Sequence, residues 1–180
     1  PDDILFLGTS HGLYYRDNKN KRWKDITGNL PNVRITDVEI NYCVKKIRVS
    51  TFGRGIWEAP LILPALEITE NQKWFGKKRF CQDVIIKKGT TVIADTTAVI
   101  DFPENGKLCI EKGAKLILQG SKLSIACDKN WQGVELEGTL EVKNYAFIKK
   151  AITGITAYPG CNSDTTNLKF IECKKQIIFK

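Results

Sequence analysis

Acidic side chains in the second half of the chain are the first residues whose spacing suggests chemistry. Glu135 and Glu137 are two positions apart, so they share one face if they belong to a β-strand. Two carboxylates on one face are the arrangement that glycosidases use as acid and base and that calcium sites use as ligands. Glu141 extends this alternation beyond Gly138. A solvated outer strand face explains the same pattern more simply, so we predict no catalytic residue and no metal site.

Tryptophans close to basic residues form the second candidate site. Trp74 precedes Lys77, Lys78 and Arg79 in what we expect to be an exposed junction, and Trp131 offers another flat ring. Indole faces stack on sugar rings, and lysine and arginine donate hydrogen bonds to sugar hydroxyls. The sequence therefore predicts a carbohydrate-binding site at these five residues. The competing interpretation is hydrophobic packing, in which Trp74 covers an open end of the fold and Trp131 fills a corner.

Other catalytic arrangements are missing from the sequence. His11 is the only histidine, and it lies in a Ser-His-Gly turn without a cysteine or aspartate at ligand spacing, so we expect a structural role in that turn. Ser10 lacks a base at a recognisable distance. Motifs for cofactors and for nucleic acids are also missing. We therefore predict no cofactor and no nucleic-acid partner.

The cysteines carry information about the redox environment. Six of them are dispersed along the chain without a CxxC pair: Cys43, Cys81, Cys109, Cys127, Cys161 and Cys173. An even, dispersed set is typical of extracellular proteins with disulfides. Some can instead be small buried hydrophobes, as we expect for Cys109 between Leu108 and Ile110. The residue types alone leave the pairing open.

The composition is that of a folded chain. Its 180 residues are 42% hydrophobic, and the longest apolar stretch, 59–66, is interrupted by Pro60 and Pro64, so we expect no membrane insertion. The net charge of +8 favours encounters with polyanions, although lysine pairs such as Lys87 and Lys88 are typical of solvated turns between strands. Because neither a Met nor a signal peptide is present, we expect a segment of a longer chain with flanking domains.

A repeated phrase indicates which elements position these residues. VIIKKGTTVI at 84–93 returns as LCIEKGAKLI at 108–117, a spacing of about 24 residues. FIKKAITGI at 147–155 is echoed in the same way by FIECKKQII at 170–178, with Phe147 matched to Phe170. Each copy of the first phrase has a strand-like triplet on either side of a Lys-Gly turn. Coils of this length, made of short strands and tight turns, are typical of a parallel β-helix.

The first 62 residues follow a different pattern. Strand-like runs at 4–9, 12–16, 34–40, 46–51 and 53–58 are separated by polar turns. We interpret them as a four-stranded antiparallel unit, about one blade of a β-propeller plus a strand shared with its neighbour. The predicted fold class is therefore all-β, with an antiparallel propeller blade followed by parallel β-helix coils.

Specific phrases in this first part resemble a known family. LGTSHGLYYRD, RWKDITGNLPN, ITDVEI and KIRVSTFGRGIWEAPL are similar to the last blade of the sortilin-like, Asp-box family of β-propellers found in secreted proteins. FGRGIWEA resembles the strand that closes the propeller ring. The Asp-box itself is degenerate: Trp23 is retained, but Arg16, Asp17, Asn18 and Asn20 stand where the family has Ser, Asp and Gly.

From about Glu70 onward, the chain resembles the segment that follows such propellers in large secreted bacterial surface proteins, many of them exported by the type IX route. The phrases that carry this resemblance are RFCQDVIIKKGTTVI, GKLCIEKGAKLILQGSKLSIACDKNWQGVEL and GTLEVKNYAFIKKAITGI. The resemblance implies the first coils of a right-handed parallel β-helix. It also implies a disulfide between Cys81 and Cys127.

These observations predict three segments: a propeller-blade-like antiparallel β unit at 1–62, a Pro-containing connector at 63–69, and β-helix coils at 70–180. We expect a non-enzymatic, extracellular or cell-surface module, a scaffold or adhesive stalk that binds polysaccharide or other surface proteins. One alternative is a fragment of a polysaccharide-active enzyme, either a lyase on the β-helix or a glycosidase on the complete propeller. Another is a subunit of an extracellular filament or surface assembly, whose terminal strands pair with neighbouring chains.

Overall fold

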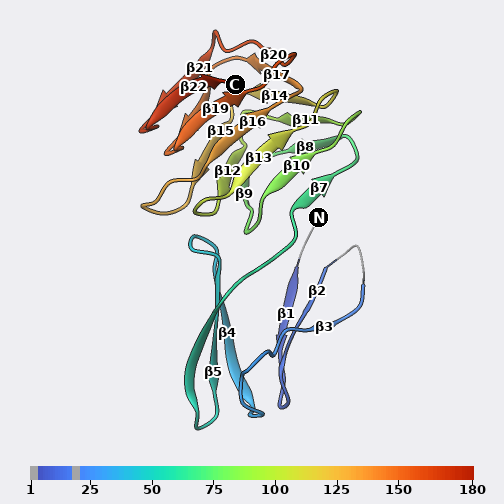
Figure 1. Cartoon of the computed structure of the whole chain (residues 1–180), viewed down its shortest axis with the longest axis vertical. Coiled ribbons are helices and arrows are strands. Elements are labelled where there is room, and N and C mark those ends of the chain that lie inside the picture. Colours follow the sequence, from blue (N-terminus) through green and yellow to red (C-terminus); the bar gives the residue numbers. More distant parts are fainter. Residues whose placement is uncertain (1–3, 18–20) are drawn as a thin grey trace. The chain divides into compact units, whose positions relative to one another are not determined.

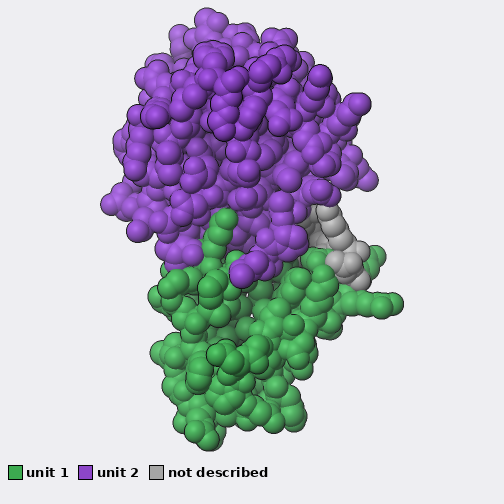
Figure 2. Space-filling view, viewed as in Figure 1, with its two compact units in different colours: residues 1–41, 45–61 green, residues 42–44, 62–180 purple. Residues whose placement is uncertain are grey.

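The computed structural model describes residues 4–17 and 21–180. Within these residues every regular element is a β-strand and no helix occurs, which confirms the predicted all-β class. The chain divides into two compact units (Figure 2). Unit 1 contains residues 1–41 and 45–61, and unit 2 contains residues 42–44 and 62–180.

Unit 1 is built from two antiparallel sheets of three strands each (Figure 1). The first contains β1 (Leu5–Gly8), β2 (Leu13–Arg16) and β3 (Lys24–Asp25), and the second contains β4 (Ile35–Asn41), β5 (Lys46–Thr51) and β6 (Gly55–Pro60). The turn between β1 and β2 is held by Thr9, whose hydroxyl accepts hydrogen bonds from the amides of His11 and Gly12. His11 therefore belongs to a structural turn.

The strands of unit 1 do not form the expected single four-stranded sheet but two separate sheets of three strands. β3 is an additional strand of only two residues that pairs with β2, whereas β4 pairs with β5 in a separate sheet. A two-residue strand shows too little alternation to be recognised in a sequence. The match to a propeller blade stays a prediction, and Asn18 and Asn20 of the degenerate Asp-box lie outside the described residues.

Unit 2 is a parallel β-solenoid of about five turns, in which each turn contributes one strand to each of three parallel sheets (Figure 1). Sheet I contains β7 (Leu66–Ile68), β10 (Val84–Ile86), β13 (Lys107–Ile110), β16 (Gly133–Leu136), β19 (Thr153–Ala157) and β22 (Lys175–Phe179). Sheet II contains β8 (Gln72–Trp74), β11 (Thr91–Ala94), β14 (Lys115–Gln119), β17 (Thr139–Lys143) and β20 (Asn162–Ser163). Sheet III contains β9 (Lys77–Arg79), β12 (Val99–Phe102), β15 (Lys122–Ile125), β18 (Ala146–Lys149) and β21 (Leu168–Ile171).

Alternation along the solenoid strands sends every second side chain into the interior. In β10, Val84 and Ile86 are fully buried and Ile85 between them is partly exposed. Parallel pairing places Val84 beside Leu108 and Ile86 beside Ile110, so equivalent apolar side chains stack from turn to turn. The repeat therefore encodes a core in which each turn covers the next.

Aromatic rings form a second line along the interior. Trp74 contacts Phe80, Phe80 contacts Phe102, and Phe102 stacks on Trp131 with ring centroids 4.5 Å apart. The indole nitrogen of Trp131 donates a hydrogen bond to the Lys149 carbonyl at 2.9 Å. These four aromatic side chains are buried and pack against one another inside the solenoid.

The registers test both repeated phrases. The first is confirmed, because β10 pairs with β13 in the register that aligns 84–93 with 108–117. The second is out of register by one residue, because Ile148 rather than Phe147 pairs with Phe170. A slip of one residue exchanges the inner and outer faces of a strand, and Ile148 is the buried residue of the two. The sequence alignment of Phe147 with Phe170 therefore pairs an outward-facing residue with one on the opposite face of the sheet.

The boundaries of the solenoid also differ from the prediction. Unit 2 resumes at Ile62, and its first strand, β7, pairs with β10 from Leu66 onward. The range 63–69 is therefore not wholly a connector, and the coils begin before residue 70. A strand of three residues next to Pro64 resembles a linker in sequence, and only its pairing identifies it.

One disulfide links Cys43 to Cys127, with Cα atoms 6.1 Å apart and a separation of 84 positions in sequence. Both cysteines belong to unit 2, because residues 42–44 group with the solenoid. The predicted partner Cys81 is wrong: its thiol is a hydrogen-bond donor to the Gln82 side chain at 3.7 Å. The bond itself confirms the expected disulfide chemistry and indicates an oxidising environment.

Candidate functional site

The two tryptophans predicted to stack on sugars do not present their rings to solvent. Trp74 is 1% exposed and Trp131 is 0% exposed, and both belong to the interior aromatic line. This part of the predicted site is wrong, and the alternative of hydrophobic packing is correct. Indole is both the best stacking platform and one of the largest apolar groups, so its type alone does not separate the two roles.

The predicted basic residues lie on β9 at the first turn of sheet III. Lys77 and Arg79 are exposed, and Arg79 approaches the Asp101 carboxylate at 3.8 Å. Lys78 is partly buried, and its ammonium lies 5.6 Å from the centre of the Phe80 ring. The three residues therefore share one strand, with Lys77 and Arg79 on its outer side and Lys78 directed toward the aromatic interior.

Glu135, the first of the acidic candidates, is held in a small polar cluster on the outer side of sheet I. Its carboxylate accepts hydrogen bonds from Lys107 at 2.9 Å and from the Cys109 thiol at 3.0 Å. Partial burial raises the pKa of Glu135, but these two hydrogen bonds outweigh it and the net shift is downward. The hydrogen bond to Glu135 raises the pKa of Lys107.

Cys109 is a poor nucleophile in this cluster. Burial, followed by the hydrogen bond to Glu135, raises the pKa of the thiol to about 12. A thiol of this kind stays protonated at neutral pH, and the thiolate is the reactive form. Because the Glu135 carboxylate is also a weakened base, the cluster stabilises neighbouring turns and is not suited to proton or acyl transfer.

The other acidic candidates do not join Glu135. Glu141 lies on β17 of sheet II, where hydrogen bonds from Lys115 and Lys143 lower its pKa. Glu137 follows the end of β16 and is exposed. The expected extension of the Glu135 face to Glu141 is wrong, because the chain turns a corner between 136 and 139 and Glu141 belongs to another sheet. Among the described residues, no group of three or more potential ligands is placed to hold a metal ion.

The outer surface of sheet III differs in charge from the other two sheets, which the sequence analysis did not detect. Its outer side carries five basic side chains and one acidic side chain: Lys77, Arg79, Lys122, Lys149 and Lys169, with Asp101. Sheet I carries two of each sign, and sheet II carries three basic and one acidic. The basic residues are visible in the sequence on four of the five strands, but they could be grouped only once the strands were assigned to sheets.

Unit 1 contains a small cavity whose lining includes Ile47, Val49 and Trp57 together with Thr27 and Glu58. Its volume is about 60 Å³. Sites for small molecules and cofactors usually have several hundred Å³, so this cavity is suited to a few water molecules. It therefore offers no room for a sugar ring or a cofactor.

Comparisons with known proteins add no family assignment: no family model, curated protein or solved structure matches the chain. Over residues 4–17 and 21–180, the structure has no helix able to cross a bilayer. Because of its excess of basic side chains, we take the outer surface of sheet III as the candidate functional site.

Proposed function

We propose that this chain is a non-enzymatic structural module of a larger secreted or cell-surface protein, acting as a rigid scaffold or adhesive stalk. The observation that carries the proposal is a solenoid with a continuous apolar interior and a disulfide, a bond that is typical of oxidising environments. Its polar clusters are ion pairs between neighbouring turns, not arrangements poised for catalysis.

The solenoid is suited to carrying load and resisting proteases. Each inner strand is hydrogen-bonded to the turns before and after it, so few backbone groups between them are open to attack. Between strands, turns are also linked, as where the Gly89 amide donates to the Gly113 carbonyl at 3.0 Å. Both glycines adopt a left-handed backbone conformation, which allows the tight Lys-Gly turn to recur.

We further propose that unit 1 is part of a β-propeller in the parent chain. Its edge strand β6 is exposed at every position, including Ile56, which is 76% exposed. Phe52, in the turn before it, is 75% exposed. Apolar side chains at an unpaired sheet edge are what a neighbouring sheet would cover. This supports the resemblance to a propeller blade and predicts that further sheets come from elsewhere in the parent.

Mass spectrometry of the protein from its native source tests this proposal. We expect an intact mass well above that of the 180 residues and a linked peptide pair containing Cys43 and Cys127 that separates on reduction. Cys109, Cys161 and Cys173 should be alkylated in unfolded protein without prior reduction, which provides an internal control. A free-standing product of this length with six reduced thiols would contradict the extracellular scaffold.

A further inference from the structure

Five side chains form a straight row across the outer surface of sheet III. Parallel pairing places Lys77 beside Val99, and Val99 beside Lys122. The pairing continues from Lys122 to Phe147 and from Phe147 to Lys169. We call these five residues the sheet III row. Lysines therefore occupy the first, third and fifth turns, with apolar side chains on the turns between them.

The sheet III row faces outward. The residues that follow Val99, Lys122 and Phe147 along the three middle strands are fully buried (Ile100, Leu123 and Ile148), so alternation directs these three row members outward. The strand register carries Lys77 and Lys169 onto the same side. Lys77 and Lys169 are exposed, and the remaining three members are partly exposed. The row is thus a surface that a ligand can contact along the length of the solenoid.

The lysines of the row lack the carboxylate partners that several lysines on the other sheets have. On sheets I and II, Lys107 and Lys115 each pair with a glutamate on the next turn, and Lys87 pairs with Glu111. No ion pair to a lysine of the row occurs in the part of the chain that the structure describes. Ion pairs between turns occur on all three sheets, on sheet III between Arg79 and Asp101, so the unpaired lysines of the row leave their positive charge for an external anion.

The spacing of these charges is regular. Neighbouring strands of a sheet are about 4.8 Å apart, so lysines on alternate turns are separated by about 10 Å along a straight line. An extended polyuronate has carboxylates that point to alternate sides of the chain, so every second one faces a flat surface beneath it. A regular, straight set of cations matches a linear polyanion better than it matches a compact anion.

Apolar groups between the lysines can contact sugar rings. Val99 and Phe147 occupy the second and fourth turns of the row. Tyr145, just before β18, is 61% exposed, and the Lys169 ammonium lies 4.9 Å from the centre of its ring. Aromatic and aliphatic faces beside cations are suited to the C–H faces of a sugar that also carries a carboxylate.

We propose that the sheet III row binds a linear acidic polysaccharide lying along the solenoid axis. Lys77, Lys122 and Lys169 pair with its carboxylates, and Phe147 and Tyr145 contact its rings. This assignment rests on the proposed extracellular function, which the disulfide favours and which would put the protein where acidic polysaccharides rather than nucleic acids are the common polyanions. Single-stranded nucleic acids are moreover usually bound by several aromatic side chains that stack with successive bases.

The test is calorimetric titration of the disulfide-bonded chain with oligogalacturonides and with the same oligomers after full methyl esterification. We expect the acidic form to bind, the ester to bind much more weakly, and added salt to weaken binding to the acid. Replacing Lys77, Lys122 and Lys169 together by Gln should weaken binding about tenfold, as expected for three exposed ion pairs.

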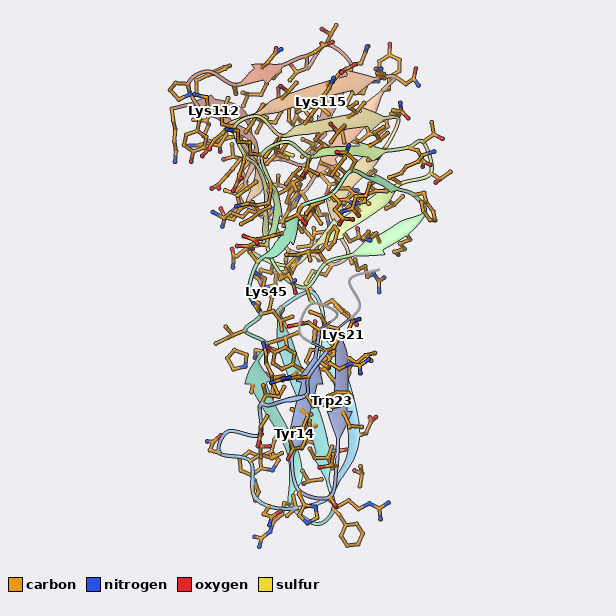
Figure 3. The ribbon with its side chains drawn as sticks, turned by 90° about the vertical axis from the view of Figure 1, so that its right-hand side faces the viewer. Tyr14, Lys21, Trp23, Lys45, Lys112 and Lys115 are labelled. Atoms are coloured by element: carbon orange, nitrogen blue, oxygen red, sulfur yellow. A yellow bond between two sulfur atoms is a disulfide. The ribbon has the colours of Figure 1, made fainter. Side chains whose placement is uncertain are left out.

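A matched variant controls for net charge. Lys88, Lys112 and Lys175 are exposed lysines in turns or on sheet I, and Figure 3 shows Lys112 in the turn before β14. Replacing these three by Gln removes the same charge and should change affinity less than about twofold. Phe147→Ala should weaken binding while leaving its salt dependence unchanged, because the Phe147 ring carries no charge.

Three results would overturn the proposal: no binding of the acidic oligomer, an equal loss in the two triple variants, or tighter binding of oligodeoxythymidylate through the same lysines. Each of these would leave the scaffold function intact if native protein still shows the larger parent and the Cys43 to Cys127 bond. Conversely, if the native cysteines are all reduced and the row still binds the acidic oligomer, the proposed extracellular location would be wrong and the proposed binding surface would stand.

Discussion

Unit 2 closes its own hydrophobic core, whereas unit 1 leaves much of its apolar surface uncovered. In the solenoid, Trp131 and Ile148 are 0% exposed because strands on neighbouring turns cover them. In unit 1, Ile56 and Phe52 are about three quarters exposed, although Ile47 and Val49 on β5 are buried. Two sheets of three strands have too little surface to cover both faces of each, while stacked turns cover one another repeatedly. We therefore expect the solenoid to be the more stable unit, and the exposed apolar side chains of unit 1 are consistent with the proposed covering by further sheets.

The largest effect should come from breaking the aromatic line of the solenoid. Trp131→Ala removes the ring stacked on Phe102 and the hydrogen bond to the Lys149 carbonyl, and should lower the free energy of unfolding by about 3 to 5 kcal/mol. Urea unfolding followed by circular dichroism measures the change. Phe75→Ala is the control, since Phe75 is 70% exposed and should change stability by less than about 0.5 kcal/mol. Equal effects of the two would refute the closed interior.

Removing the disulfide should have the next largest effect. Cys43→Ser opens a covalent loop of 84 residues and should lower stability by about 2 to 4 kcal/mol under oxidising conditions. Thermal unfolding with and without reductant measures the loss, and the variant should no longer respond to reductant. Cys161→Ser, which changes a thiol outside the bond, serves as control. A wild-type protein insensitive to reductant would argue against a stabilising bond.

Acid should weaken the ion pairs between turns by a smaller amount. Hydrogen bonds from lysines lower the pKa of Glu111 and Glu141 in the folded protein. A lowered folded pKa means that these carboxylates add stability above the ordinary glutamate pKa of about 4.3, and that this contribution is lost as pH falls through the folded value. The melting temperature should therefore decline between pH 5 and pH 3, values chosen to bracket a pKa of about 4.3.

A pair of variants checks the source of that decline. Glu141→Gln removes the carboxylate that pairs with Lys115 and Lys143, so it should make the melting temperature less sensitive to acid. Glu137→Gln should not, because Glu137 makes no ion pair within the described residues. If both variants kept the full acid sensitivity, other carboxylates would have to account for it.

The smallest effect should come from the exposed face of unit 1. Ile56→Ser should change the stability of the chain by less than about 0.5 kcal/mol, because Ile56 has little apolar contact to lose. Ile47→Ser on the neighbouring strand, where the side chain is 5% exposed, should be clearly destabilising. Chemical denaturation of both variants measures the contrast. A large loss at Ile56 would show that this face is covered in the protein, which would change the comparison between the units.

Particular residues show how far the sequence could be interpreted. The solenoid was predictable from the return of VIIKKGTTVI as LCIEKGAKLI, because Lys-Gly turns and alternating apolar residues must recur when identical turns stack. The strand β7 was not, because Leu66-Glu67-Ile68 has no distinctive pattern without its partner β10. The burial of Trp74 was not decided either, because a tryptophan beside lysines is equally typical of a binding site and of a core edge.

What the sequence determined by itself was therefore local: all-β structure, turns at glycines, and coils whose apolar residues alternate. Only the tertiary structure decided which distant residues meet, because such contacts depend on the number of residues in each turn. It paired Cys127 with Cys43 instead of Cys81, placed Glu141 on a different sheet from Glu135, and aligned Lys77, Lys122 and Lys169 in one row. Inserting or deleting one residue in a turn would move the side chains of the following strand to its opposite face. The position of each of these side chains therefore depends on the lengths of all the turns, which no local pattern specifies.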